Sequence, residues 1–129
     1  MKKKTLEVDS VVVQTSEHRS ELHCPRCGGG NLHQSVVKVY NRNEDDPRVW
    51  RTVVTEDAVE SKMAVSLTLE NPSPRRQGLI ISFACEACSG DVVQDAMELH
   101  IFQHKGATLL KWRFTENVSE ESAIWKSSD

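Results

Sequence analysis

The chain has few aromatic residues and no long apolar run. Aromatic residues make up 5% and hydrophobic residues 38% of its 129 residues. Such a chain is expected to form one domain with a modest core. The longest apolar-rich run, residues 79–84, has the length of one strand and falls far short of the roughly 18 residues of a membrane span. No apolar segment follows Lys2–Lys4, so we expect no secretion signal, no membrane partner and a cytoplasmic location.

The sequence also has little excess charge of either sign. The formal net charge is −3. Residues 1–23 and residues 24–114 each contain equal numbers of basic and acidic residues, so the acidic excess lies in residues 115–129. A chain without a basic surplus is not expected to bind nucleic acid through bulk charge. We therefore expect a protein or nucleic-acid partner, with protein favoured. The sequence indicates no oligomeric state.

No catalytic motif is present. The sequence contains no glycine-rich phosphate loop, no recognisable pair of carboxylates and no Ser-His-Asp order. The acidic run Asn43–Asp46 lacks the spacing and the glycine of a calcium loop, so it predicts a turn. These absences favour a binding protein over an enzyme, although an active site assembled from scattered residues stays open.

Composition divides the chain into three parts. Residues 1–20 carry few large apolar side chains and predict an N-terminal arm that is partly mobile. Residues 115–129 are acidic and rich in serine, and they predict a frayed C-terminal tail. The ordered domain is therefore expected over residues 21–114.

Within this domain the hydrophobic pattern is mostly that of β-strands. The clearest strands are predicted over residues 33–40, 48–54, 79–85, 97–104 and 107–114. The last two are expected to form a hairpin around Lys105-Gly106. Trp50 and Trp112 are expected in the core. The predicted fold class is mainly β, with six or seven strands.

Residues 59–70 fit two structures. Their apolar residues alternate with polar ones, which favours a half-buried strand. The apolar set is Val59, Met63, Val65, Leu67 and Leu69. The same segment is rich in helix formers, so a helix that begins near Thr55 is the alternative. The alternation favours the strand and leaves the helix open.

Four cysteines form two CxxC pairs, Cys24 with Cys27 and Cys85 with Cys88. One CxxC turn presents two sulfurs to an ion, and two turns complete the tetrahedron that zinc takes with four thiolates. Gly28 follows the first pair directly, where a residue tolerant of positive φ lets backbone amides point at the sulfurs. The four cysteines therefore predict one structural zinc ion, with no coordination position open for catalysis.

The string CPRCG with a later CxxC resembles the paired knuckles of the zinc-ribbon class. This resemblance implies a small β domain with structural zinc and no particular activity. Because 57 residues separate Cys27 from Cys85, we expect a single zinc-ribbon-like domain with an enlarged antiparallel sheet inserted between the knuckles. The pattern also resembles rubredoxin, which implies an iron-bound electron carrier as an alternative. Residues 71–79 and 103–112 resemble small bacterial proteins, and this resemblance implies no activity.

Weaker candidates lie on strand 97–104 and in nearby loops. His100 and His104 share one face of this strand, and Met97, Leu99 and Ile101 share the other, which is expected to be core. Arg75, Arg76 and Lys105 are expected to lie in loops, where they could form a basic cluster. The candidate binding residues are Arg75, Arg76, His100, His104 and Lys105.

Two functions follow from these patterns, besides electron transfer. The first is a zinc-clasped module that binds a protein or a nucleic acid. The second is a small hydrolase or nuclease in which His100, His104 and Lys105 act together and the zinc is only structural.

Overall fold

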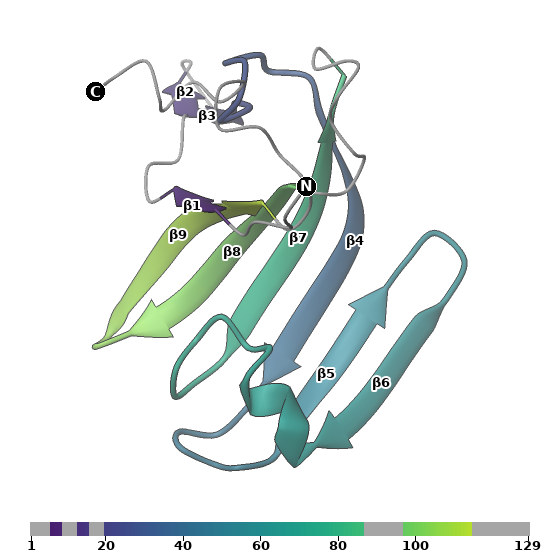
Figure 1. Ribbon diagram of the computed structural model, residues 1–129, viewed down its shortest axis with the longest axis vertical. Coiled ribbons are helices and arrows are strands. Elements are labelled where there is room, and N and C mark those ends of the chain that lie inside the picture. The colour runs from purple at the N-terminus through teal and green to yellow at the C-terminus, as the bar shows by residue number, and fades with distance from the viewer. Residues whose placement is uncertain (1–5, 9–12, 16–19, 87–96, 115–129) are drawn as a thin grey trace.

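The computed structural model describes residues 6–8, 13–15, 20–86 and 97–114, and this part of the chain is mainly β (Figure 1). Its strands are β1 (Leu6–Val8), β2 (Val13–Thr15), β3 (Ser20–Leu22), β4 (Leu32–Asn41), β5 (Val49–Val54), β6 (Val59–Ala64), β7 (Gly78–Cys85), β8 (Met97–His104) and β9 (Ala107–Phe114). A short 3₁₀ helix, η1 (Val65–Thr68), follows β6. No helix among the described residues has the length and apolar character needed to cross a membrane. The predicted tail, residues 115–129, lies outside the described residues.

Within the described residues, seven strands form one antiparallel sheet in the order β1-β9-β8-β7-β4-β5-β6. Strands β2 and β3 form a separate two-stranded hairpin. The long strands β4 and β7 lie side by side in the middle of the main sheet (Figure 1). The chain therefore leaves β4, forms the β5–β6 hairpin, and returns through η1 to pair β7 with β4.

The five clearest predicted strands are confirmed to within one residue at each end. Strands β8 and β9 have the predicted bounds, and the turn between them places Lys105 at φ 49° and Gly106 at φ 81°. Two successive left-handed residues match the right-handed twist of the paired strands, which is why a glycine suits this turn. The loop after β4 likewise contains one left-handed residue, Asp45, at φ 59°.

The strand predicted over residues 59–70 ends early, at Ala64, and no helix begins near Thr55. Strand β6 lies at the edge of the sheet and pairs only with β5, and the last pair joins Ala64 to Val49, the first residue of β5. Because β5 offers no further residue to pair with, the chain leaves the sheet after Ala64 and forms η1. This turn lets Leu67 be buried, whereas Leu69 is 93% exposed.

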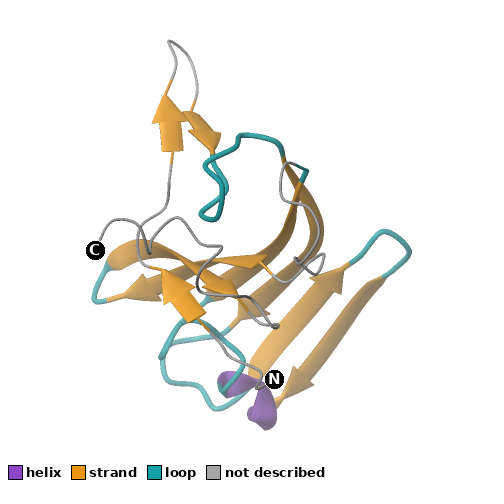
Figure 2. Cartoon of the chain, turned by 45° about the horizontal axis from the view of Figure 1, so that its top comes forward, coloured by secondary structure: helices purple, strands orange, loops and turns teal. Residues whose placement is uncertain are grey.

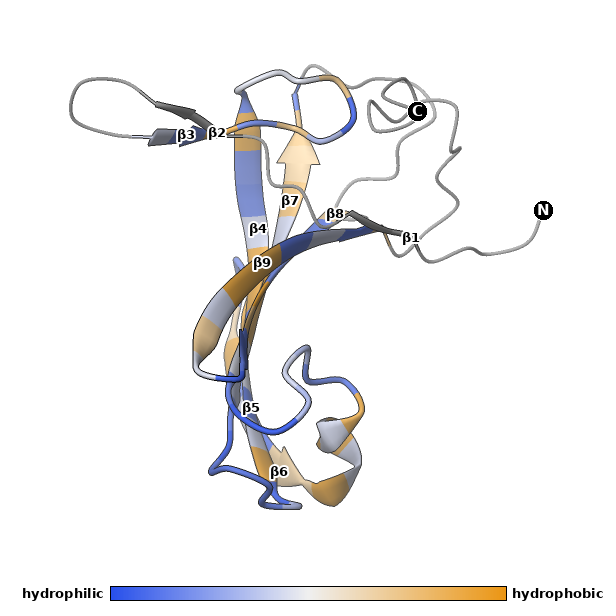
Figure 3. Ribbon diagram, turned by 90° about the vertical axis from the view of Figure 1, so that its left-hand side faces the viewer, coloured by the Kyte–Doolittle hydropathy of each residue, from blue (hydrophilic) through white to orange (hydrophobic). Residues whose placement is uncertain are grey.

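The core lies in two clusters at opposite ends of the sheet, one on each face. The first includes Cys24 of the CxxC loop and comprises Cys24, Cys85, Met97, Leu99, Trp112 and Phe114. The second lies beside η1 and comprises Tyr40, Val49, Leu67 and Ile80. The core positions predicted for Met97, Leu99 and Trp112 are confirmed. Figure 2 shows η1 beside the end of β6, and Figure 3 shows that β9 carries both hydrophobic and hydrophilic residues.

The exposure of Trp50 contradicts its predicted core position. This side chain is 53% exposed, because among the described residues no element covers that face of β5. Alternation along a strand indicates which residues share a face but not whether another layer covers it. The same reason explains why Val59 and Met63 remain exposed.

The surroundings of Gly78, at the start of β7, leave no room for a side chain. A Cβ atom there would clash with the Asn71 side chain and lie 2.7 Å from Pro72 Cγ. Asn71 holds the loop before β7, since its Oδ1 accepts from the Ser73 amide at 3.0 Å and its Nδ2 donates to the Arg76 carbonyl at 2.7 Å.

We expect Gly78→Ala to lower the free energy of unfolding by about 1–3 kcal/mol in urea denaturation, because the added Cβ atom has no room. The neighbouring exposed substitution Gln77→Ala is the control, and an equal loss in both variants would contradict this account.

Candidate metal centre

Three cysteines from distant parts of the chain meet at one end of the sheet. The Sγ atoms of Cys24, Cys27 and Cys85 all lie within 4.8 Å of one another. Cys27 Sγ and Cys85 Sγ are 3.5 Å apart, although 58 positions separate these residues in the sequence. Among the described residues, no disulfide joins these three cysteines. The fourth predicted ligand, Cys88, lies outside the described residues.

The loop between β3 and β4 directs two backbone amides at the sulfurs. The Arg26 amide lies 3.3 Å from Cys24 Sγ, and the Gly29 amide lies 3.4 Å from Cys27 Sγ. The loop is closed by two backbone bonds, from the Gly28 amide to the Cys24 carbonyl at 2.9 Å and from the Cys24 amide to the Gly29 carbonyl at 2.8 Å. Gly28 adopts φ 80°, so the predicted positive φ after the first CxxC pair is confirmed.

Strand pairing brings Cys85 to this loop. Cys85 is the last residue of β7, and its partner in β4 is Leu32, the first residue of that strand. The Glu86 amide donates to the Asn31 carbonyl at 3.0 Å and continues the pairing past the strand ends. The β4–β7 register therefore places Cys85 beside the CxxC loop.

Burial differs among the three sulfurs. Cys24 is fully buried and Cys85 is nearly so, whereas Cys27 is exposed. Burial raises the pKa of the Cys24 thiol to about 11, although the amides of Arg26 and Cys27 act in the opposite direction. A thiol with this pKa stays protonated at neutral pH unless a cation beside it stabilises the thiolate.

The three sulfurs fit a metal ion. Four zinc–sulfur bonds of about 2.3 Å give a tetrahedron with sulfur–sulfur edges of about 3.8 Å, close to the 3.5 Å between Cys27 and Cys85. A disulfide needs a much shorter distance of about 2.05 Å. Thiolates select soft or borderline metals such as zinc, copper(I) and iron. The cluster could therefore hold a metal ion, and the donor set alone does not choose among these metals.

The structure brings four of the weaker candidates together. Arg75, Arg76, His104 and Lys105 line one pocket of about 260 Å³ between the β8–β9 turn and the loop before β7. The two arginines are already paired, because Arg75 binds Asp45 at 2.5 Å and Arg76 binds Glu44. These ion pairs tie the loop before β7 to the loop after β4 and offset much of the pocket's positive charge.

The fifth candidate, His100, is separated from this pocket. It is buried, and its Nε2 atom lies 3.0 Å from Glu98 Oε1 on the same strand. His100 and His104 lie on one face of β8, as predicted, but His104 is exposed at the strand end whereas His100 is buried, and of the two only His104 lines this pocket. Glu98 was not among the predicted site residues, although its two-residue spacing from His100 places both on one face of a strand.

The ion pair between Asp45 and Arg75 predicts a small pH effect. The hydrogen bond from Arg75 holds the pKa of Asp45 below its ordinary value of 3.8. A carboxyl whose folded pKa is depressed adds stability above its unfolded pKa and loses it as pH falls through its folded pKa. Asp45→Asn should slightly lower the urea midpoint at neutral pH and have no effect once Asp45 is protonated in acid. Asp57→Asn, in the exposed β5–β6 turn, is the control, and a loss for Asp45→Asn that persists unchanged in acid would contradict the ion-pair explanation.

Comparisons with known proteins identify no family. No family model, curated protein or solved structure matches this chain. The interpretation of the site therefore rests on its own geometry: three converging sulfurs, two amides that point at them, and the strand pairing that positions Cys85.

Proposed function

We propose that this protein is a small binding module in which a structural zinc ion clasps one end of an antiparallel sheet. In this proposal Cys24, Cys27 and Cys85 are three ligands and Cys88 is the fourth, as in zinc-ribbon knuckles. The observation that carries the proposal is the convergence of three sulfurs with amides directed at two of them. Four thiolates leave no coordination position for a reacting water, so the zinc has a structural role.

The surface available to a partner is one face of the main sheet. Strand pairing aligns its accessible residues in three rows: Met63-Trp50-Asn41, Ser61-Thr52-Val39-Leu79-Ile101-Leu110, and Val59-Val54-Val37-Ile81. The third row continues into Leu99 and Trp112, which are buried in the first core cluster. We call this the uncharged face, because none of these residues carries a charge. The opposite face carries Lys38, Arg51, Lys62, Glu98 and Lys111.

The chemistry of the uncharged face favours protein over nucleic acid. Phosphate groups are bound mainly by lysine and arginine, and this face has neither. Protein interfaces instead concentrate aromatic residues and methionine and are depleted of charge at their centre. Trp50 and Met63, both exposed and paired across β5 and β6, fit that description.

The proposal is tested by cross-linked affinity capture from the host cell with two variants of neighbouring residues. Val39→Glu introduces a charge on the uncharged face, and Lys38→Glu introduces the same side chain on the opposite face. We expect wild type and Lys38→Glu to retain the same protein and Val39→Glu to lose it. Retention of nucleic acid that survives Val39→Glu, or capture that no variant changes, would contradict the proposal.

A further inference from the structure

We infer that the partner of the uncharged face is a second copy of this chain, so that two such faces pack against each other in a symmetric dimer. This inference rests on the proposed function and specifies its partner. It is carried by three features of the face: a groove beside an exposed tryptophan, the absence of charge, and the amount of apolar surface.

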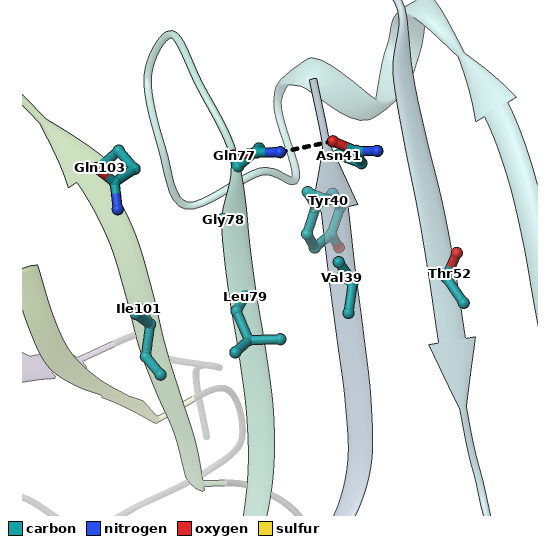
Figure 4. Close-up of a pocket in the computed structure, with 9 residues that line it drawn as sticks. All are labelled: Val39, Tyr40, Asn41, Thr52, Gln77, Gly78, Leu79, Ile101 and Gln103. Carbon is teal, nitrogen blue, oxygen red and sulfur yellow. Dashed lines mark hydrogen bonds between the residues drawn. The ribbon is translucent and has the colours of Figure 1, made fainter. Parts of the chain in front are cut away.

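The groove and the tryptophan lie next to each other. A hollow of about 640 Å³ is lined by apolar Val39, Leu79 and Ile101, whose side chains come from three neighbouring strands (Figure 4). At one end Gln77 Nε2 donates to Asn41 Oδ1 at 2.7 Å, which leaves a polar rim. Trp50 is the β5 partner of Asn41 and is 53% exposed.

This arrangement is self-complementary. In a dimer with a twofold axis, the same patch of each copy meets the other, and a contact from one residue to another occurs twice. A twofold axis in the plane between two uncharged faces lets Trp50 of each copy enter the groove of the other. Tryptophan is among the residues enriched at interface hot spots, which lie in well-packed pockets shielded from water.

The absence of charge favours a second copy over a different partner. When a face meets itself, like charges that lie near the axis are brought together, at a cost of several kcal/mol. The three rows of the uncharged face have no such charges, and the charged side chains lie on the opposite face. A partner that used charge for recognition would find no complementary group here.

The exposed apolar side chains of the face supply more than half of the area that a standard dimer interface needs on each partner. The exposed large side chains of the face are Val39, Trp50, Val54, Val59, Met63 and Leu110. Together they expose on the order of 500 Å², near the upper end for the largest apolar patch of a monomer. A standard interface covers about 800 Å² on each partner. Polar neighbours such as Thr52 and Gln103 supply further area, and two sheets stack face to face at about 10 Å.

Sedimentation equilibrium of the zinc-loaded full chain tests this inference. We expect wild type to show twice the 14.5 kDa mass of one chain. Trp50→Ala and Met63→Glu should each raise the dissociation constant by on the order of tenfold or more. Lys62→Glu places the same side chain as Met63→Glu one residue away, on the opposite face of the same edge strand, and should leave the dimer intact. Thermal melts followed by circular dichroism confirm that each variant is folded.

The outcomes separate this inference from the proposed function. A wild type that stays monomeric at every concentration, or a dimer that Lys62→Glu breaks and Met63→Glu does not, overturns the inference. If the monomer still captures another protein in a way that Val39→Glu abolishes, the proposed function stands and only the second copy is rejected. If the monomer captures no protein, both are rejected.

Discussion

Removal of the metal is expected to unfold the domain. Binding of a structural zinc ion provides about 10–16 kcal/mol in small zinc-finger peptides, whereas the net stability of a whole domain is about 5–15 kcal/mol. The proposed clasp joins the loop before β4 to the end of β7, and it lies against the larger of the two core clusters. Thermal melts by circular dichroism should therefore show a cooperative transition for the zinc-loaded protein and its loss, or a large fall in its midpoint, after chelation.

Two controls separate loss of the metal from other effects. The same chelator saturated with zinc should leave the melt unchanged. Cys27→Ser should reproduce much of the destabilisation, and since Cys27 is exposed, the change does not act through lost packing. An identical melt with and without chelator, or a Cys27→Ser variant as stable as wild type, would contradict the clasp.

Loss of the Trp112 side chain is expected to be the most destabilising single change in the core. Trp112 is fully buried, and its ring meets Phe83 edge to face, with centroids 5.8 Å apart at an angle of 71°. Replacing a buried tryptophan by alanine typically costs about 3–5 kcal/mol. Trp112→Ala should therefore lower the free energy of unfolding by about that amount in urea denaturation of the zinc-loaded protein.

The same change should also loosen the metal site, because Trp112 belongs to the cluster that contains Cys24 and Cys85. We expect Trp112→Ala to release zinc to a competing chelator faster than wild type. Leu109→Ala is the control: Leu109 lies on the same strand, on the other face, and is 38% exposed. Its effect should stay under about 1 kcal/mol, as is usual for surface positions. Equal losses for the two variants would contradict the assignment of this core.

The strands themselves were predictable because their signals are local. Period-two alternation identified β8 and β9, and the Lys105-Gly106 turn between them needs residues that accept positive φ. The end of β6 at Ala64 was not predictable in the same way. It depends on where β5 begins and on the burial of Leu67 against residues far away in the sequence.

Which face of the sheet is covered could not be predicted either. Trp50, which was expected in the core, is exposed, whereas His100, on a face with charged neighbours, is buried. Coverage depends on how segments distant in sequence are arranged, and a strand's own pattern does not contain that information.

For the candidate metal site, the sequence indicated the cysteines but not that three of them lie close together. The CxxC spacing and Gly28 predicted the geometry of the first CxxC loop. The approach of Cys85 depends on the pairing of β4 with β7, two strands separated in the chain by the β5–β6 hairpin. The ion pairs that join Arg75 and Arg76 to the loop after β4 likewise arise from this long-range arrangement.

The most direct test of the account is the metal content of the purified protein by native mass spectrometry. We expect one zinc ion per chain in wild type and its loss in Cys27→Ser prepared in the same way. A wild-type chain that carries no metal, or one in which Cys24, Cys27 or Cys85 is joined in a disulfide, would contradict it.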